Sequence, residues 1–516
     1  MEMLIVSFFA FLIFCLISVK LSTKSKADKL KLPPGPRQLP IIGNMHQMLG
    51  GLPHCVLRDL AKKYGPLMHL KFGEVSTIVV SSPEMAKEVF QKHDILFADR
   101  PSNLIAFKIS SYDFLDIFAS PYSDYWRQLR KICTMELLSS KRVQSFRSIR
   151  EGEVLNLIRW ISVQEGSVIN LSKKLFSLIF GIITRAAFGK KNRYEEQFHH
   201  LDEQMTKLAS GFCIADMYPS VRLFQVMSGV KPKLENLQKQ LDEILGNILE
   251  EHKEESMKQK LGGGEAKEDL IDVLLNVHKR GDFGAALSNS SIKAVICNMF
   301  SAGSDTSSSA LEWAISEMIK HPTTMKKAQD EVRNVFQETG NVDETKLGEL
   351  KYLQAVIKET LRVHPSAPLL APRECREQCE INGYTIPAKA RVFVNAWAIG
   401  RDPMYWNEPE KFIPERFLGS EIDYQGNHYE YVPFGGGRRV CPGMSFGLAN
   451  IALPLAQLIY HFDWKLPGDL KPEELDMSED VSALSARKNN LYIIPMVYSR
   501  SFMKKEITAE VMMDEA

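Results

Sequence analysis

The segment that most constrains this chain is PFGGGRRVCPG, Pro433 to Gly443. Its eleven residues contain one cysteine, Cys441, together with four glycines, two prolines and two arginines. Glycines let a backbone turn tightly and lie close to another group. A thiol in such a loop can form a disulfide, act as a nucleophile or ligate a metal, and each of these roles requires different neighbours.

The other cysteines narrow these alternatives. The chain has eight cysteines in 516 residues, at positions 15, 55, 133, 213, 297, 375, 379 and 441. They are too few and too irregularly spaced for a disulfide framework, so we expect a reducing compartment. Cys375 and Cys379 form a C-x3-C pair, but nothing completes a zinc site, and we interpret them as ordinary residues of an Arg/Glu-rich connection. No histidine pairs locally with Cys441, which leaves nucleophilic catalysis open but unsupported.

A single thiolate ligand to a large, flat cofactor would use every part of the loop. The glycines would let the backbone lie close to a macrocycle, and Arg439 would neutralise a carboxylate of that cofactor. Haem iron held by the Cys441 thiolate meets these requirements.

The first residues differ from the rest of the chain. MLIVSFFAFLIFCLISV, Met3 to Val19, carries no charge over 17 residues, the low end of the roughly 17–25 that span a bilayer as a helix. Five lysines and one aspartate follow by residue 31, which places the remainder on the cytosolic side. A cleaved signal peptide is the alternative, but the apolar run exceeds the usual core and no clear cleavage site follows it. We therefore predict a membrane anchor over residues 1–20 and a basic, Pro-rich hinge over residues 21–44.

Residues 45–516 are predicted to form one mostly helical α+β body with its strands at the two ends. Two β-rich runs flank Gly73-Glu74, which predicts a hairpin within Pro66 to Val80. The pattern is mostly helical from there to about residue 365, with an exposed polar loop at Lys258 to Asp269. The net charge of +1 shows none of the excess positive charge that nucleic-acid binding requires, so we exclude nucleic acid as a partner.

A long helix is predicted to begin near Ser288 and to end before Pro322. In its middle, Ala302-Gly303 offer little bulk, so a flat ligand could lie against this notch, and Asp305-Thr306 follow directly. Thr306 has a second interpretation, because a threonine within a helix often donates to the carbonyl four residues earlier.

Two further groups of charged residues have both a surface and a buried interpretation. Glu359 and Arg362 share one helix face, and the default interpretation is a surface ion pair that contributes little to stability. Arg416 lies among apolar residues in FIPERF, which favours a buried cluster of the three as a structural lock. Trp126 and Arg130 also share a helix face, and a surface arginine over a core tryptophan is the default there.

Six motifs follow one another along the chain: LPPGPR, DYWRQLRK, AGSDTS, KETLR, PERF and FGGGRRVCPG. Only the cysteine loop is strongly specific by itself, but the set spans the whole chain and resembles the plant microsomal cytochrome P-450 enzymes. More narrowly, the chain is similar to the D subfamily of the 71 family, whose members oxidise terpenes and terpenoid indole alkaloids. Its KYGPLMHLKFGEVSTIVVSSP, HDILFADRPSNL and NAWAIGRDP segments are most similar to alkaloid enzymes of the tabersonine 16-hydroxylase type.

The resemblance implies a cytochrome P-450 fold, with a large helical body and small β-sheets after one transmembrane helix. Cys441 would be the axial ligand of haem b, with Phe434 packed beside its sulfur and Gly443 in the cofactor-binding loop. The haem propionates would be held by four residues: Trp126, Arg130, Arg373 and Arg439.

The resemblance also assigns the residues around the reacting face. Ala302-Gly303 would be the oxygen groove, with Asp305 and Thr306 as the proton-delivery pair. The substrate pocket would include Phe114, Phe118, Ala302, Leu369 and Leu484. The buried structural triad would be Glu359, Arg362 and Arg416. Ser482-Ala483-Leu484 stands where related enzymes carry Gly-Val-Thr or Gly-Leu-Thr, which leaves substrate identity and regiochemistry open.

The implied activity is hydroxylation or epoxidation of an apolar polycyclic plant metabolite, and we expect a monoterpenoid indole alkaloid, with a sesquiterpene or monoterpene as the alternative. The implied partners are O2, the small apolar substrate, membrane lipid and NADPH-cytochrome P-450 reductase. The implied location is the endoplasmic reticulum membrane, with one span and a cytosolic catalytic domain. A reductase-independent haem-thiolate isomerase or dehydratase and a non-enzymatic haem protein are the other classes. The Asp305-Thr306 pair favours the monooxygenase, because rearrangement requires no proton relay to dioxygen.

Overall fold

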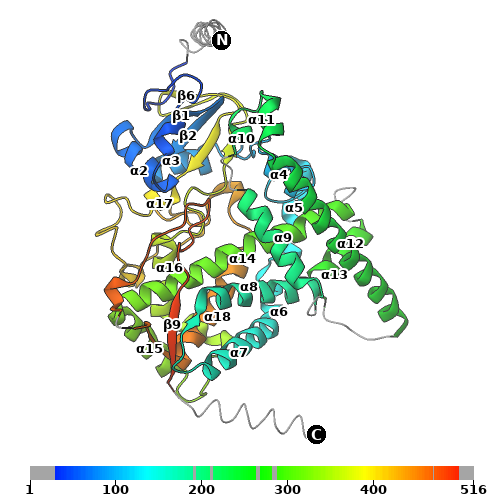
Figure 1. The fold of residues 1–516 in the computed structure, drawn as a ribbon, viewed down its shortest axis with the longest axis vertical. Helices are drawn as coiled ribbons and strands as arrows, with labels where there is room; N and C mark the ends of the chain where they lie inside the picture. Colours follow the sequence, from blue (N-terminus) through cyan, green and yellow to red (C-terminus); the bar gives the residue numbers. More distant parts are fainter. Residues whose placement is uncertain are drawn as a thin grey trace, which may run out of the picture.

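The computed structural model describes residues 30–189, 193–209, 213–262, 268–281, 287–468 and 470–498. Figure 1 shows a large helical body below a small lobe in which blue strands from early in the chain lie beside yellow segments from residues near 400. No helix within these residues is long and apolar enough to cross a membrane. The predicted anchor over residues 1–20 lies outside the described residues.

One long helix, α14 (Asn289–Lys320), runs through the middle of the helical body (Figure 1). The Ser288 hydroxyl caps its first turn, and Pro322 follows its end. It packs against α8 (Leu171–Phe188) and α18 (Met444–His461). These bounds match the predicted helix, because both of its ends are set by local residues.

The other α-helices bury their apolar faces either in the core around α14 or in the two smaller clusters of the lobe. They are α2 (Pro53–Tyr64), α3 (Pro83–Lys87), α4 (Ile105–Ser110), α5 (Asp124–Ile132), α6 (Ser140–Ser145), α7 (Arg147–Val163), α9 (Glu195–Leu208), α10 (Ile214–Met217), α11 (Arg222–Met227), α12 (Val230–Gly262), α13 (Leu270–Arg280), α15 (Pro322–Val335), α16 (Lys351–Val363) and α17 (Ala396–Ile399). Because α12 continues to Gly262, the predicted loop at Lys258 to Asp269 is wrong for its first five residues, where Lys, Gln and Leu favour helix. Residues 263–267 of that segment lie outside the described residues.

The main sheet joins the two ends of the chain. Its order is β1-β2-β7-β4, with β1 (Leu67–Phe72) and β2 (Val75–Val80) forming the predicted hairpin. β2 pairs in parallel with β7 (Arg391–Val394), and β7 pairs antiparallel with β4 (Arg373–Glu374). Arg373 is thereby held at the edge of a sheet that begins with residue 67.

Two smaller sheets complete the strands. One has the order β3-β9-β8, from β3 (Ile169–Asn170), β9 (Tyr492–Val497) and β8 (Phe462–Lys465). The other pairs β5 (Cys379–Ile381) with β6 (Tyr384–Ile386). The fold is therefore mostly helical with small sheets, as predicted, and among the strands of the described residues only the two-residue β3 lies far from either end of the chain.

The described part of the predicted hinge is bound to the sheet. Pro34 O accepts from His69 N at 2.9 Å, and the backbone N of Asn44 donates to Lys71 O at 2.6 Å. A side chain at Gly35 would lie 2.0 Å from His69 O, so the close contact requires glycine at this position. Residues 30–44 thus belong to the lobe and are not a free linker.

Candidate active site

The cysteine loop places a thiol at the start of a helix. Cys441 N donates to Phe434 O at 3.0 Å, and α18 begins three residues after Cys441. Burial raises the pKa of the Cys441 thiol, while a hydrogen bond from the Gly443 backbone and the charge of Arg130 oppose this rise. A helix N-terminus and a nearby cation both favour a thiolate, which is the form that ligates a metal.

Two glycines of the loop allow a close contact with another part of the protein. A side chain at Gly436 would lie 2.7 Å from the Phe90 ring, and one at Gly437 would lie 2.4 Å from Phe90 O. Gly437 also has φ +65°, which a side chain would strain. These two glycines allow the loop to pack against the π-helical turn Glu88–Lys92, so the close approach that they permit is to protein.

Four guanidinium groups gather beside this loop. Arg100, Arg373 and Arg439 are buried and Arg130 is half-buried. Burial lowers the pKa of Arg439 and of Arg100, and the charges of Arg373 and Arg130 lower both further. Sequence reasoning missed Arg100. The available signal was its place after the apolar stretch of HDILFADRPSNL, the same kind of environment that singled out Arg416.

Within the described residues, these four arginines form no ion pair with a carboxylate and donate to backbone carbonyls. The acceptors are Phe118 O, Ala371 O and Pro372 O for Arg100; Val440 O for Arg130; Phe97 O and Gly436 O for Arg373; and Ala98 O, Ile117 O and Ser120 O for Arg439. Burial lowers the pKa of Arg373 to about 10, and burial with repulsion from Arg373 lowers that of Arg439 to about 9.

Buried charge without a counter-ion is costly, so this cluster is suited to a ligand that brings negative charge. Haem b brings two propionate carboxylates and an iron that accepts a thiolate. The residues present therefore fit haem b, with Cys441 as the iron ligand and the arginines at the carboxylates.

Trp126 takes a supporting position in this cluster. Its indole N–H donates to Ile117 O at 2.9 Å, and its ring centroid lies 4.1 Å from the Arg439 guanidinium carbon. The Arg130 guanidinium lies 5.9 Å from the same ring. Trp126 thus stabilises two of the cations through its ring face.

The middle of α14 carries the predicted notch, but Ala302 and Gly303 lie on different sides of the helix. Ala302 is exposed, whereas a side chain at Gly303 would lie 2.9 Å from the Ile183 side chain of α8. Gly303 therefore permits close packing of the two helices. The Thr306 hydroxyl donates to Ala302 O at 2.6 Å, which is the backbone bond that its second interpretation requires.

Two carboxyl groups, those of the buried Asp202 and the half-buried Asp305, lie near this notch. Burial, with a contribution from Glu203, raises the pKa of Asp305 to about 6. Burial also raises the pKa of Asp202 on α9 to about 7, with Asp305 adding to the rise and a hydrogen bond from Ser301 opposing it. Sequence reasoning missed Asp202, because nothing local links α9 to α14.

Some of the predicted pocket residues lie beside α14. Ser366 Oγ donates to Thr306 O at 2.9 Å, and Ser485 N donates to Ser366 O at 3.0 Å, which brings the Leu484 turn close to Thr306. Phe118 N donates to Asn298 Oδ1 at 3.3 Å. Asn298 lies about one helical turn before Ala302 on α14, so Phe118 is also close to this part of the helix.

The other two predicted pocket residues have different surroundings. Leu369 packs against a cluster of the lobe that includes Leu70 and Val79. Phe114 lies in a turn where it, Tyr112 and Asp113 all have positive φ.

The structure brings Glu359, Arg362 and Arg416 together in a buried cluster. Arg362 Nε and Nη2 donate to Glu359 Oε2 and Oε1 at 2.7 and 2.8 Å, and Arg416 Nε donates to Glu359 Oε1 at 3.0 Å. Arg362 also donates to Gly400 O and Lys411 O at 2.6 and 2.9 Å. The cluster thus ties α16 to the chain that precedes the cysteine loop.

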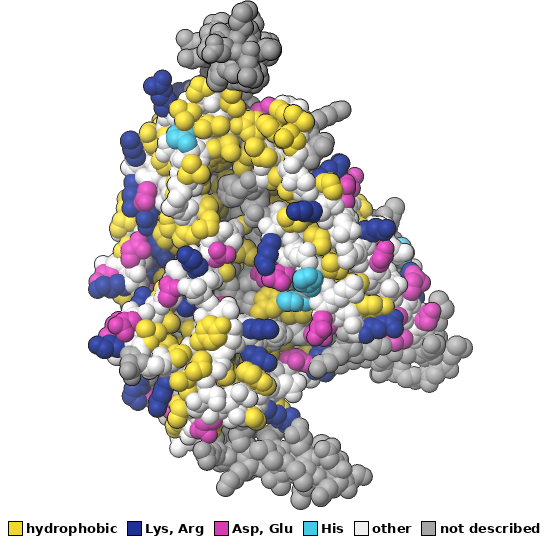
Figure 2. Space-filling view, in the orientation of Figure 1, with side chains coloured by type: hydrophobic (Ala, Val, Ile, Leu, Met, Phe, Trp, Pro, Cys, Tyr) yellow, Lys and Arg dark blue, Asp and Glu magenta, His cyan; other side chains and the backbone are white. Residues whose placement is uncertain are grey.

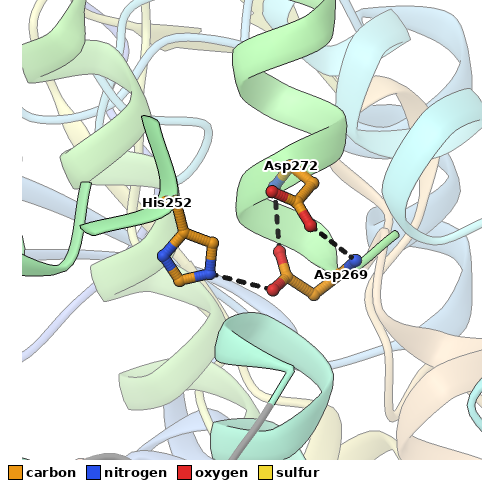
Figure 3. A group of neighbouring side chains, drawn as sticks. All are labelled: His252, Asp269 and Asp272. Atoms are coloured by element: carbon orange, nitrogen blue, oxygen red, sulfur yellow. Dashed lines mark hydrogen bonds and ion pairs between the residues drawn. The ribbon is translucent and has the colours of Figure 1, made fainter. Parts of the chain in front are cut away.

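A second group of metal-type ligands lies outside this site (Figure 3). His252 Nε2 lies 2.9 Å from Asp269 Oδ2, and its Nδ1 lies 2.8 Å from Ile248 O. Asp269 and Asp272 form a capping box at the start of α13. Because hydrogen bonds engage both ring nitrogens of His252, we interpret the group as a cap that joins α12 to α13.

The comparisons with known proteins agree with this site. The family model for Cytochrome P450 matches residues 33–494. Tabersonine 16-hydroxylase 2 of Catharanthus roseus is 59% identical over 509 residues, which is 98% of this chain and 99% of that protein. Tabersonine 6,7-epoxidase isoform 1 of the same plant is 57% identical over 505 residues, 97% of this chain and 99% of that protein.

A solved zebra fish cytochrome P450 with abiraterone has the same fold. Its TM-score is 0.72 at 24% identity, over 87% of this chain and 99% of that chain. With the family match over most of its length and these full-length relatives, the chain belongs to the cytochrome P450 family.

Proposed function

We propose that this cytochrome P450 monooxygenase hydroxylates or epoxidises a monoterpenoid indole alkaloid. Its activity as a monooxygenase and its use of haem b, with electrons from NADPH through a reductase, follow from the family. The observation that carries the substrate proposal is the identity of 57–59% to one hydroxylase and one epoxidase that are both named for tabersonine. Apolar Phe118, Ala302 and Leu484 near the middle of α14 support it, since an apolar polycyclic molecule needs few polar partners.

Each part of the site has a role in this reaction. Haem b, when bound, supplies the reductive activation of dioxygen. The Cys441 thiolate would ligate its iron, and Arg100, Arg130, Arg373 and Arg439 would bind its carboxylates. Ala302 leaves the face of α14 open for substrate and oxygen.

Asp305 and Thr306 deliver protons on that face. With a pKa raised to about 6 by burial, the Asp305 carboxyl can both take up and release a proton near neutral pH. The Thr306 hydroxyl reaches Ala302 O in this structure, and rotation about its χ1 frees it to pass a proton onward.

The substrate test uses membranes that contain the full chain and a plant reductase. Tabersonine and related indole alkaloids are expected to shift the haem spectrum from low to high spin and to yield an oxygenated product that depends on NADPH. A shift with bicyclic sesquiterpenes and none with the alkaloids would replace this proposal with the terpene alternative. Product formation without NADPH would instead favour an isomerase or dehydratase.

The pocket test changes one side chain. Leu484→Thr restores the threonine of related enzymes, and we expect it to alter the product ratio more than total turnover, since a small change of shape or an added hydroxyl in an apolar site changes the binding free energy by only about 1–3 kcal/mol. Leu418→Thr, at an exposed leucine, is the matched control. A product ratio unchanged by Leu484→Thr would remove Leu484 from the pocket.

The ligand test concerns Cys441. Cys441→His is expected to abolish the thiolate-type Soret band of the reduced carbon monoxide complex, because imidazole lacks the negative charge of the thiolate. Cys55→Ser, in α2, is the control and should keep the band. A thiolate-type band in the Cys441→His protein would refute the assignment.

We also place the chain at the endoplasmic reticulum membrane, through the predicted anchor and a second contact. Hydrophobic side chains gather at the top of Figure 2, over the lobe. Ile41, Leu49 and Leu223 are 56%, 80% and 60% exposed, and the Tyr218 hydroxyl, which donates to Ile41 O at 3.3 Å, joins the segment before α11 to residue 41. Such a surface suits partial insertion into a bilayer.

A further inference from the structure

Cys375 and Cys379 lie close together, shortly after Arg373 of the arginine cluster. Their sulfur atoms are 4.0 Å apart. Cys375 directly follows β4 and is buried, and Cys379 begins β5 and is half-buried. The C-x3-C spacing thus places two free thiols side by side, one of them within reach of solvent.

The two thiols differ in reactivity. The Cys375 Sγ donates to Glu377 O at 2.9 Å and lies 4.0 Å from the Cys379 Sγ, and the interaction between the two thiols lowers the pKa of the Cys379 thiol and raises that of Cys375. A thiol with a lowered pKa and partial exposure is the one that an oxidant attacks. Cys379 therefore suits the attacking role, and buried Cys375 suits the resolving role.

We propose that Cys375 and Cys379 form a peroxide-oxidised thiol pair that closes to a disulfide. The Cys379 thiolate attacks hydrogen peroxide, forming an S–O bond and breaking the O–O bond, and the leaving hydroxide takes up a proton to become water. Cys375 then attacks the Cys379 sulfenic acid, forming the S–S bond and releasing a second water. Overall, two thiols and one hydrogen peroxide give one disulfide and two waters.

The peroxide has a local source, because a monooxygenase that reduces oxygen without forming product releases it. Cellular thiols such as glutathione would reverse the reaction. The proposal rests on the positions of the two thiols and does not depend on the identity of the substrate.

Closure would require movement of one side of the pair, because an S–S bond is only about 2.05 Å long. The backbone of Cys375 is fixed in the sheet, where its N donates to Ala390 O at 2.8 Å and its O accepts from Lys389 N at 2.7 Å. Cys379 pairs with Ile386 only at the end of the β5–β6 ladder, so we expect the movement to fall on Cys379 and on the turn over residues 376–378.

That turn supports the segment that carries the haem arginines. Arg376 N donates to Leu96 O at 2.8 Å. The next two residues after Leu96 carry carbonyls that accept hydrogen bonds from the arginine cluster. Phe97 O accepts from Arg373, and Ala98 O accepts from Arg439 at 2.7 Å. Movement of the turn would loosen this stretch, so we infer that the disulfide weakens retention of haem.

The chemical test uses the cleavage sites of trypsin around the pair. Cleavage after Arg373, Arg376 and Lys389 gives peptides 374–376 and 377–389, with one cysteine in each. The holoenzyme is treated with hydrogen peroxide, quenched with catalase, alkylated and digested. We expect the two peptides to be joined in the treated sample and separate after dithiothreitol. If they stay separate at a peroxide dose that oxidises Cys55 in the same sample, the proposal is wrong.

Single variants separate the two roles. Cys375→Ser should stop at the Cys379 sulfenic acid, which dimedone traps. Cys379→Ser should leave Cys375 alkylatable at the same peroxide dose. If Cys375 is oxidised as readily in Cys379→Ser as in the parent chain, Cys379 is not the attacking thiol.

The effect on haem is measured by transfer of haem to apomyoglobin. Peroxide-treated enzyme should lose haem several-fold faster than untreated enzyme, and dithiothreitol should restore the slow rate. Cys379→Ser, given the same treatment, is the control for direct damage to the haem and should show no reversible change. An unchanged transfer rate in a sample whose peptides are joined would overturn the link to haem retention.

Discussion

The charge of Arg439 shows how a single buried residue can be prepared for a ligand. Three backbone carbonyls accept from it, but it forms no ion pair with a carboxylate of the described residues, and Arg373 and Arg130 repel its charge while Asp99 and Asp116 attract it from beyond ion-pair distance. A carboxylate placed among these groups would convert an unfavourable cluster into a set of charge-assisted hydrogen bonds.

Arg439→Met is accordingly expected to have opposite effects on the two forms of the protein. Haem affinity should fall about 10- to 100-fold, since a hydrogen bond to a charged group contributes about 1.5–3 kcal/mol. The haem-free protein should melt at an unchanged or higher temperature, because one repelling charge has been removed. Haem titration and thermal melts measure these two effects.

Arg401→Met is the matched control for that experiment. Arg401 is also buried, but its Nε lies 3.1 Å from Glu410 Oε2, so its loss should destabilise the protein without a comparable loss of haem affinity. Equal loss of haem affinity in both variants would contradict a specific role for Arg439.

Thr306→Ala is expected to bind substrate normally but to waste reducing power, because protonation of oxygen becomes less controlled. The spin-state shift should persist, while less product and more peroxide form per NADPH consumed. Ser308→Ala is the control, since the Ser308 hydroxyl also bonds the carbonyl four residues earlier but is buried. If Thr306→Ala forms as much product per NADPH as the parent enzyme, Thr306 has no role in proton delivery and serves only to bond Ala302 O.

The role of a single residue could be predicted from the sequence where a motif includes that residue. It was much harder to predict where the role depends only on contacts with residues far away in the chain. The arginine before Cys441 stands in a distinctive loop, so its place near a carboxylate could be inferred. Arg100 has no local partner, and its role depends on Arg373 and Arg439, which follow more than 270 residues later. The same limit hid Asp202, whose neighbours Ser301 and Asp305 belong to another helix.

At the scale of elements, the cap between α12 and α13 depends on pH. Burial would lower the pKa of His252, but its hydrogen bond to Asp269 and the charge of Asp269 outweigh burial and raise it from 6.5 to about 9. A pKa that is higher in the folded state stabilises the fold fully below about pH 6.5, and this contribution disappears as the pH rises through 9.

His252→Gln should therefore cost about 1.5–3 kcal/mol of stability near pH 6 and much less near pH 9.5. Thermal melts of both proteins across this range measure the difference in melting temperature, which should shrink as the pH rises. His200→Gln, at an exposed histidine of α9, is the control. A difference that stays constant or grows with pH would contradict a charged His252.

Elements whose limits are local were the most predictable. Ser288 and Pro322 define α14 directly, and Gly73-Glu74 define the first hairpin. The pairing of β2 with β7 joins residues more than 300 positions apart, and no short pattern announces it. The end of α12 was placed too early, because a run of charged and polar residues also suits an exposed helix.

At the scale of the whole molecule, the exposed apolar surface and the predicted anchor should act together on membrane binding. Deletion of residues 1–22 is expected to release only part of the protein, with the haem spectrum intact. The further change Ile41→Ser with Leu223→Ser should release most of the remainder, because burying each such side chain in lipid is worth about 1.5–3 kcal/mol. Sedimentation with vesicles measures the bound fraction.

Ile95→Ser with Tyr405→Ser, at exposed apolar residues outside the 41–49 and 214–227 segments, is the control for this comparison. Full release by the deletion alone would show that the surface makes no contact. Loss of haem from the truncated protein would contradict a catalytic body that folds without its first residues.

The order of strands in the main sheet also determines when that sheet can form during translation. β2 leaves the ribosome 311 residues before Arg391, the first residue of β7. At about 5–20 residues per second this interval lasts roughly 15–60 s. Throughout it the β2 edge has no native partner, and unpaired edges invite aggregation. The sheet of the lobe, although its first strands are translated early, is therefore completed only after most of the helical body has been made, and we expect a newborn chain to be prone to aggregation at that edge until β7 is present.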